Sequence, residues 1–143
     1  MHHIGIVVKD LGKATRHYEV AMSAVQVAST VRDPVQLADI AFVKIPGNNV
    51  LVELIAPYAE EAPVTGFLKH RGGGLHHVCY SASDIRTTQD EWRKDGAIPV
   101  FGPVPALAFG GSPILFMYLR DRSLVELVEG SQDVDPVGLL KEG

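Results

Sequence analysis

The segment His2-His3-Ile4-Gly5-Ile6-Val7-Val8 lies 74 positions before a second segment of similar character, His76-His77-Val78-Cys79-Tyr80-Ser81-Ala82. Further matches follow in the same order: Asp10-Leu11 with Asp84-Ile85, Phe42-Val43 with Phe116-Met117, and Leu51-Val52-Glu53-Leu54 with Leu124-Val125-Glu126-Leu127. The offset falls from 74 to 73 across the turn residues 46–49, where a change of length is tolerated. The chain therefore reads as two copies of one small unit.

Within each copy, the local signals predict the order strand, helix, strand, strand, strand. Runs rich in β-branched residues predict strands, and Asp10 and Asp84 are suitable helix N-caps followed by apolar residues at helical spacing. In the first copy we expect a strand over 4–8, a helix after Asp10, and strands near 25–31, 38–45 and 50–55. In the second copy we expect a strand from the second histidine doublet, a helix ending near Gly96, and strands near 98–101, 114–119 and 123–128.

The repeat predicts a single α+β domain over residues 1–129, built from two tandem βαβββ modules. Module one is expected over 1–56, a linker over 57–74 and module two over 75–129. The linker is rich in proline and glycine, and its middle, residues 64–69, is expected to form a helical turn. Residues 130–143 form a tail outside the repeat, expected to pack loosely or to add a short helix over 137–140.

The composition narrows the class of protein. A chain of 143 residues that is 46% hydrophobic and 21% charged is typical of one globular domain. Its formal charge of −4 lacks the basic excess of a nucleic-acid-binding protein. No apolar run approaches the length of about 18 residues that a membrane span needs, and the start of the chain lacks the features of a signal peptide. The single cysteine, Cys79, excludes an internal disulfide. Together, these features lead us to expect a cytoplasmic protein without nucleic-acid or membrane partners.

Two glutamates lie where strands are otherwise apolar. Glu53 stands between valine and leucine in the first copy, and Glu126 does so in the second. A buried carboxylate is costly unless it is paired or bound to a metal. His3 and His77 open the first strand of each copy, so two histidines and two glutamates recur in register. They predict an N2O2 site for a divalent ion such as Co, Ni, Mn, Zn or Fe, although a single such residue is more often solvent-facing or a satisfied core residue.

The choice within each histidine doublet follows from strand alternation. His3 and His77 stand directly before the strand core at matching positions. Because successive side chains point to opposite faces of a strand, His2 and His76 are expected on the other face.

These residues carry a family resemblance. The segments 3–11, 74–78 and 124–127, together with Glu53, resemble the vicinal oxygen chelate superfamily, which includes glyoxalase I, methylmalonyl-CoA epimerases, extradiol dioxygenases and antibiotic-resistance proteins. The resemblance implies paired βαβββ modules whose mixed sheet curls around a metal, and a homodimer. It places His3, Glu53, His77 and Glu126 at the four ligand positions of the family.

The linker is similar to that of methylmalonyl-CoA epimerases. Glu61-Ala62-Pro63-Val64-Thr65-Gly66-Phe67-Leu68, followed by Gly73-Gly74-Leu75-His76-His77, resembles their Ser-Pro-Ile…Phe-Leu…Gly-(Ile/Leu)-His-His stretch. The chain departs from them at residues 118–123, where epimerases usually carry His-Pro-Lys and glycines, and near Ile40, where some carry a glutamate.

The resemblance implies an enzyme that removes a proton next to a metal-polarised carbonyl of a small-molecule substrate, either an acyl-CoA or a thiol adduct. Glu53 and Glu126 are the candidate bases, and Asp39 is a weaker one whose more common role would be at the surface. The expected substrate pocket is aromatic, from Phe42, Phe101, Phe109 and Phe116. Three functions stay open: an epimerase or other isomerase, a glyoxalase I-type lactoylglutathione lyase, and a non-catalytic protein that binds a hydrophobic compound such as an antibiotic.

Overall fold

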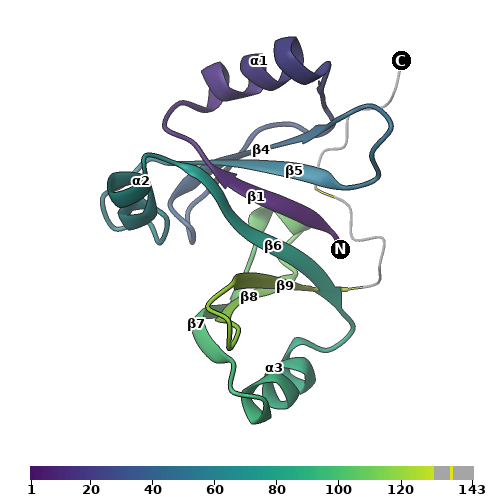
Figure 1. Cartoon of the computed structure of the whole chain (residues 1–143), viewed down its shortest axis with the longest axis vertical. Coiled ribbons are helices and arrows are strands. Elements are labelled where there is room, and N and C mark those ends of the chain that lie inside the picture. Colours follow the sequence, from purple (N-terminus) through teal and green to yellow (C-terminus); the bar gives the residue numbers. More distant parts are fainter. Residues whose placement is uncertain (131–135, 137–143) are drawn as a thin grey trace.

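A computed structural model describes residues 1–130 and 136, and Figure 1 shows an open, curled sheet with helices on its outer side. Within the described residues, nine strands form one sheet, in which β3 (Val31–Asp33) pairs with β4 and the others follow the order β2 (Val25–Gln26), β4 (Ala38–Lys44), β5 (Leu51–Pro57), β1 (His3–Val7), β6 (Gly74–Ala82), β9 (Leu124–Glu129), β8 (Pro113–Tyr118) and β7 (Ile98–Pro105). The β1–β5 and β6–β9 pairs are parallel, whereas the other pairs are antiparallel. The predicted α+β class with a curled mixed sheet is confirmed.

The first copy forms one half of the sheet. Its elements are β1 His3–Val7, α1 Leu11–Met22, β2 Val25–Gln26, β3 Val31–Asp33, β4 Ala38–Lys44 and β5 Leu51–Pro57. Helix α1 begins after Asp10, whose carboxylate accepts a hydrogen bond from the Lys13 backbone N–H at 2.9 Å. This satisfies one of the backbone donors that every helix leaves unpaired at its start.

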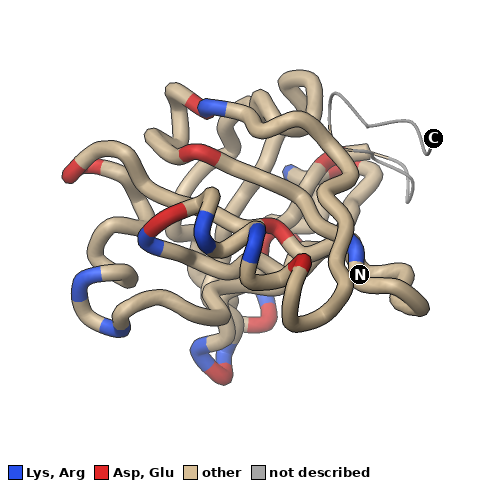
Figure 2. The backbone as a smooth tube through the Cα atoms, turned by 90° about the horizontal axis from the view of Figure 1, so that it is seen from above, with Lys and Arg blue, Asp and Glu red and all other residues tan. Residues whose placement is uncertain are grey.

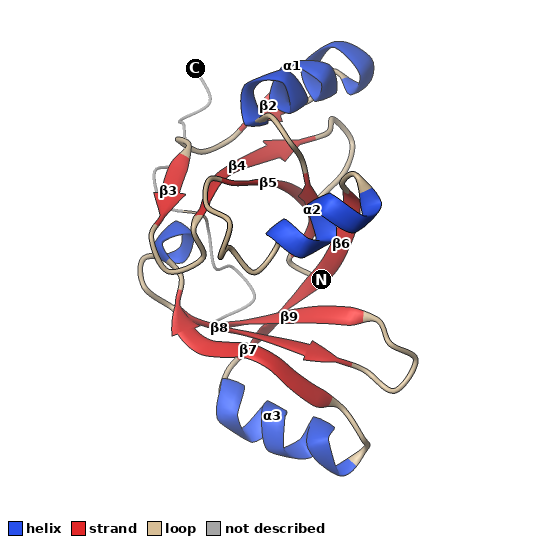
Figure 3. Cartoon of the chain, turned by 90° about the vertical axis from the view of Figure 1, so that its left-hand side faces the viewer, coloured by secondary structure: helices blue, strands red, loops and turns tan. Residues whose placement is uncertain are grey.

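The second copy repeats this layout in the other half. Its elements are β6 Gly74–Ala82, α3 Ile85–Lys94, β7 Ile98–Pro105, the 3-10 turn η1 Leu107–Phe109, β8 Pro113–Tyr118 and β9 Leu124–Glu129. Asp84 caps α3 and accepts from the backbone N–H groups of Arg86 and Thr87 at 3.0 Å each. Figure 3 shows α1 and α3 at opposite ends of the molecule, each outside its own half of the sheet.

The two halves meet where β1 pairs with β6 of the same chain, in the centre of the strand order. The ladder is regular from His3↔Cys79 to Gly5↔His77 and then continues as Ile6↔Leu75. One residue of β6, His76, is thus left over and forms a β-bulge. A bulge bends the strand and redirects a side chain.

Three local expectations differ from the structure or fall outside it. The strand near 25–31 is instead two short strands, β2 and β3, and the Gln26 side chain donates a hydrogen bond to Ala28 O at 2.8 Å in the connection between them. The strand near 98–101 continues to Pro105 with irregular register. The turn expected over 64–69 is confirmed as helix α2 Thr65–Arg71, and the helix expected over 137–140 lies outside the described residues.

Each long helix packs its apolar side against its half of the sheet. Tyr18 of α1 lies against a cluster that includes Val43 and Leu54, whereas Trp92 of α3 lies against one that includes Leu115 and Leu127. Figure 2 shows acidic and basic residues interspersed along the chain. None of the described helices is long and apolar enough to cross a membrane.

Candidate metal centre

The ladder pairings place the predicted ligands in two rows across the middle of the sheet. The first row, called the Gly5 row, consists of Phe42, Glu53, Gly5 and His77 on β4, β5, β1 and β6. The second, called the Cys79 row, consists of Phe116, Glu126, Cys79 and His3 on β8, β9, β6 and β1. Side chains of directly paired residues point to the same face of a sheet. Each row therefore brings one histidine and one glutamate to that face.

The four polar side chains of the two rows converge on one point. His3 Nε2 lies 3.1 Å from Glu53 Oε2 and 3.0 Å from Glu126 Oε2. His77 Nε2 lies 3.3 and 2.8 Å from the same two oxygens, and the two Nε2 atoms are 3.2 Å apart. All four residues are buried, with at most 3% of any of them exposed.

This arrangement fits a divalent metal ion. Imidazole and carboxylate ligands bind first-row ions at about 2.1 Å, so neighbouring ligand atoms at right angles lie about 3.0 Å apart. The observed separations of 2.8–3.3 Å agree with that value. Two carboxylates and two imidazoles, with one ligand atom each and all within 4.8 Å of one another, would share the charge of one cation. The cluster His3, Glu53, His77 and Glu126 could therefore hold a metal ion.

The two carboxylates and the two imidazoles of the cluster shift each other's pKa values in opposite directions. Burial by itself raises the pKa of the Glu53 and Glu126 carboxyls, but the two imidazoles outweigh it and the pKa of each lies below its ordinary range. Burial by itself lowers the pKa of His3 and His77, but the two carboxylates outweigh it and each pKa lies above its ordinary value. The protein therefore favours positive charge between the carboxylates, which protons supply when no metal is bound.

Both residues of each histidine doublet contribute to the cluster, whereas only the second of each was predicted to do so. The Nδ1 atom of His77 lies 2.9 Å from Nδ1 of His76, and His3 Nδ1 lies 2.8 Å from His2 Nδ1. The expectation that His2 and His76 point away is therefore wrong for both residues. The β-bulge at His76 interrupts the alternation of its strand, and His2 precedes β1, so strand alternation does not fix its direction. Burial and the charge of His77 lower the pKa of His76 to about 4, so its ring is neutral and able to accept a hydrogen bond from the His77 ring. Such a partner on the second nitrogen fixes the orientation of a ligand histidine.

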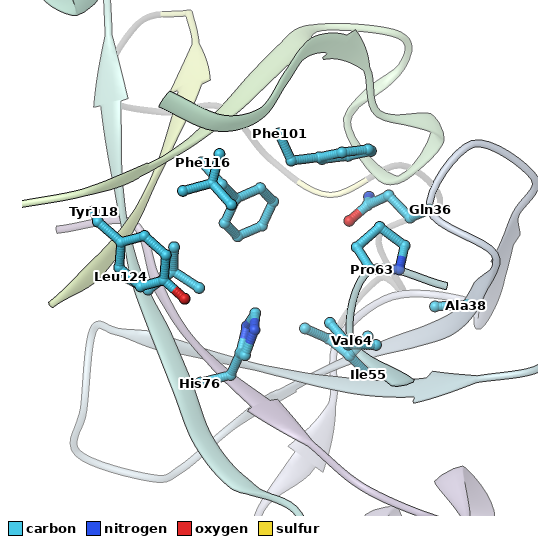
Figure 4. Close-up of a pocket in the computed structure, with 11 residues that line it drawn as sticks. Gln36, Ala38, Ile55, Pro63, Val64, His76, Phe101, Phe116, Tyr118 and Leu124 are labelled. Atoms are coloured by element: carbon cyan, nitrogen blue, oxygen red, sulfur yellow. The ribbon is translucent and has the colours of Figure 1, made fainter. Parts of the chain in front are cut away.

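A cavity of about 90 Å³ lies beside the cluster, inside the curl of the sheet. Figure 4 shows His76, Phe101 and Phe116 around this opening, with Val64 from the linker on the facing wall. The Phe116 ring centroid lies 5.0 Å from that of His77, so the cavity adjoins the polar cluster. Apart from His76, its polar lining comes from Gln36 and Tyr118.

The four predicted pocket phenylalanines divide into two pairs. Phe101 and Phe116 line the cavity. Phe42 and Phe109 lie instead against the His3 ring, with centroids 5.7 and 5.8 Å away, and belong to the buried core. The sequence reading missed Gln36, His76 and Tyr118 as lining residues; only His76 carried a signal, as the first residue of a repeated doublet.

Two other residues have structural roles. Asp39 forms a two-pronged ion pair with Arg32, at 2.8 Å to Nε and 2.9 Å to Nη2, on the edge of the sheet. This ion pair favours a structural role for Asp39 at the surface over a role as catalytic base. Cys79 is buried, and burial raises the pKa of its thiol to about 12, so the sulfur is protonated at neutral pH. Packing is therefore its role in the described structure.

Comparison with known proteins identifies related chains. The model of the Glyoxalase/Bleomycin resistance protein/Dioxygenase superfamily matches residues 2–116. The ethylmalonyl-CoA/methylmalonyl-CoA epimerase of Cereibacter sphaeroides is 33% identical over 130 residues, which cover 89% of this chain and 95% of that protein.

Solved structures agree in fold. The methylmalonyl-CoA epimerase of Mycobacterium tuberculosis superposes with a TM-score of 0.78 at 28% identity, covering 91% of this chain and 87% of that one. A Streptomyces coelicolor methylmalonyl-CoA epimerase variant, in complex with 2-nitronate-propionyl-CoA, gives 0.77 at 26% identity and covers 92% and 96%. The chain therefore belongs to the glyoxalase/bleomycin resistance protein/dioxygenase, or vicinal oxygen chelate, superfamily, as its histidine doublets and strand glutamates predicted.

Proposed function

We propose that this protein is a metal-dependent epimerase of methylmalonyl-CoA or a closely related 2-alkylmalonyl thioester. The observation that carries the proposal is the convergence of His3, Glu53, His77 and Glu126 on one buried point beside an apolar cavity. The sequence relatives and solved structures reported above, which are named as epimerases of this substrate class, support it.

In this proposal the four side chains hold a divalent first-row ion, Co, Ni, Mn, Zn or Fe. When bound, the ion supplies Lewis-acid charge that makes the hydrogen next to the thioester carbonyl more acidic. The proposed ligand geometry leaves the cavity for the substrate, and the rings of Phe101 and Phe116 would exclude water from the reacting carbon.

Inversion requires that a proton leave one face of the α-carbon and that another arrive on the opposite face. Glu53 and Glu126 suit these two tasks because they come from different halves of the sheet and approach the cluster from different strands. Each glutamate would hold the cation through one carboxylate oxygen, which leaves its other oxygen for the proton. One carboxylate would take the proton from carbon, and the other, protonated on its free oxygen, would return one from the opposite side, so that the overall proton count is unchanged.

The test follows the α-proton. Metal-loaded protein is incubated with methylmalonyl-CoA in deuterated water, and loss of the α-hydrogen signal is followed by NMR. We expect exchange with inversion by the wild type, and inversion lowered by at least about 100-fold in a Glu126→Gln variant that stays folded, because one of the two proton-transfer groups is then missing. No exchange by the metal-loaded wild type would overturn the proposal, and turnover of a glutathione hemithioacetal instead would replace it with the lyase reaction. The homodimer implied by the resemblance stays a prediction, which light scattering tests.

A further inference from the structure

The cavity beside the cluster adjoins two surface grooves. Pro63, His76, Tyr118 and Leu124 line both the cavity and a groove of about 360 Å³. That groove shares Tyr118 with a second groove of about 570 Å³, and two arginines line both. The three hollows therefore lie next to one another along a path from the buried site to the surface.

The outer part of this path is basic. Three arginines line the two grooves, and His70 lies beside them, apart from His76 of the cavity: His70, Arg71, Arg120 and Arg122. None of the residues that line these two grooves is acidic. Among the described residues, none of the three arginines forms an ion pair, in contrast to Arg32 and Lys69. Asp121, between two of them in sequence, uses its carboxylate to accept the Ser123 backbone N–H at 2.8 Å.

These basic residues come from two segments that are distant in sequence. His70 and Arg71 end helix α2 in the linker, whereas Arg120 and Arg122 lie in the connection between β8 and β9. The backbone at Arg122 is left-handed, with φ of 70°, a conformation that is unfavourable for a non-glycine residue. The fold thus places an arginine where glycine or asparagine would be easier to accommodate.

We propose that this surface, called the arginine groove and defined by His70, Arg71, Arg120 and Arg122, binds the phosphate groups of a nucleotide-bearing thioester. The inference rests on the proposed function, because it assigns the groove to the CoA half of the same substrate. Guanidinium groups bind phosphate oxygens in pairs and keep their charge at all physiological pH values. The acyl group would occupy the apolar cavity, and the arm that joins it to the nucleotide would pass Tyr118 and Leu124.

The experiment compares two substrates that differ only in the nucleotide. Wild type and an Arg71→Gln/Arg122→Gln double variant are assayed with methylmalonyl-CoA and with methylmalonyl-pantetheine, which lacks the nucleotide and its phosphates. We expect the double variant to lower kcat/KM for the CoA thioester about 10- to 100-fold, through KM, because each lost contact is a charged hydrogen bond. Its kcat/KM for the pantetheine thioester should stay within about twofold of wild type. Arg16→Gln, an exposed arginine of α1 far from the groove, is the matched control and should change neither value.

Two results would overturn the arginine groove: an equal loss on both substrates, or unchanged KM for methylmalonyl-CoA. Each single variant is also measured, so that misfolding of the double variant does not decide the outcome. Calorimetric binding of CoA itself separates this inference from the proposed function. If the wild type epimerises neither thioester but binds CoA about tenfold or more tightly than the double variant does, the groove stands and the epimerase does not. Equal affinity of both proteins for CoA would remove the groove.

Discussion

The Gly5 row and the Cys79 row carry the same two ligand types in the same order, but their central residues differ. In the Gly5 row a Cβ atom on Gly5 would overlap the His77 ring, which leans over β1. In the Cys79 row a full side chain stands opposite His3. The two imidazoles therefore reach the same point with different neighbours: His77 lies over the bare backbone of Gly5, and His3 lies beside the thiol of Cys79. The two copies thus share the histidine and the glutamate, whereas the packing beneath them differs.

The aromatic ends of the rows differ as well. Phe42, in the Gly5 row, packs against His3 and the core, whereas Phe116, in the Cys79 row, lines the cavity and contacts His77. Each phenylalanine thus packs against the histidine of the opposite row. The two phenylalanines therefore have unequal surroundings: Phe42 supports the cluster from the core, whereas Phe116 faces the cavity.

The largest effect is expected when each of the two glutamates is replaced in turn. We expect Glu53→Gln and Glu126→Gln each to lower kcat by at least about 100-fold, because both a metal ligand and a proton-transfer group are altered. Thermal unfolding and metal content are measured on the same samples. Full turnover by either variant would show that the rows are not equivalent in chemistry, and a loss of stability as large as the loss of turnover would indicate a structural role only.

Replacing Phe42 and Phe116 separately should distinguish a residue that supports the cluster from one that lines the cavity. Phe42→Ala should cost about 3–5 kcal/mol in the free energy of unfolding, as expected for a buried aromatic side chain. Phe116→Ala should also destabilise the protein, but in addition raise KM for the acyl thioester, since it opens the cavity wall. Denaturant unfolding and steady-state kinetics check this pair. Similar KM values for the two variants would contradict the division of tasks.

The centres of the rows provide a smaller, sharper contrast. Gly5→Ala should displace the His77 ring, lower metal affinity by at least about tenfold and destabilise the protein by about 1–3 kcal/mol. Cys79→Ala removes only the sulfur atom and should keep metal affinity within about threefold. Metal titration with Co²⁺ or Mn²⁺ measures both. Equal metal affinity of Gly5→Ala and wild type would mean that His77 is held in another way.

The pH dependence tests what the rows share. In metal-free protein, His3 and His77 have raised pKa values, so their stabilising contribution is complete below about pH 6.5 and is lost as pH rises through the folded-state values. Glu53 and Glu126 have lowered pKa values, so theirs is present above about pH 4.3 and is lost as pH falls. The Tm measured in a chelator should therefore fall from pH 6.5 towards 9. Added metal should reduce this fall, because metal binding requires neutral imidazole; a flat metal-free profile would contradict the coupling.

Much of this architecture could be read from the sequence because it depends on local periodicity. Asp10 and Asp84 mark the helix starts, and the glutamates in apolar strands mark the cluster, since both signals arise from neighbours in the chain. The local reading failed at His76, where a single bulged residue cancels the alternation on which the facing of every later side chain depends. The division of the phenylalanines had no local signal either, because η1 carries Phe109 back onto His3.

The sequence by itself determined that the chain is a duplicated βαβββ unit with one histidine and one glutamate per copy, because repetition and burial cost are properties of the residues in order. Only the tertiary structure decided that β1 pairs with β6 of the same chain, so that both rows meet within one molecule. It also decided which wall of the cluster is open, and that α2 and the β8–β9 connection bring their arginines to one groove. Those outcomes depend on how strands and loops that are far apart in the sequence pack together, and local sequence patterns do not determine that packing.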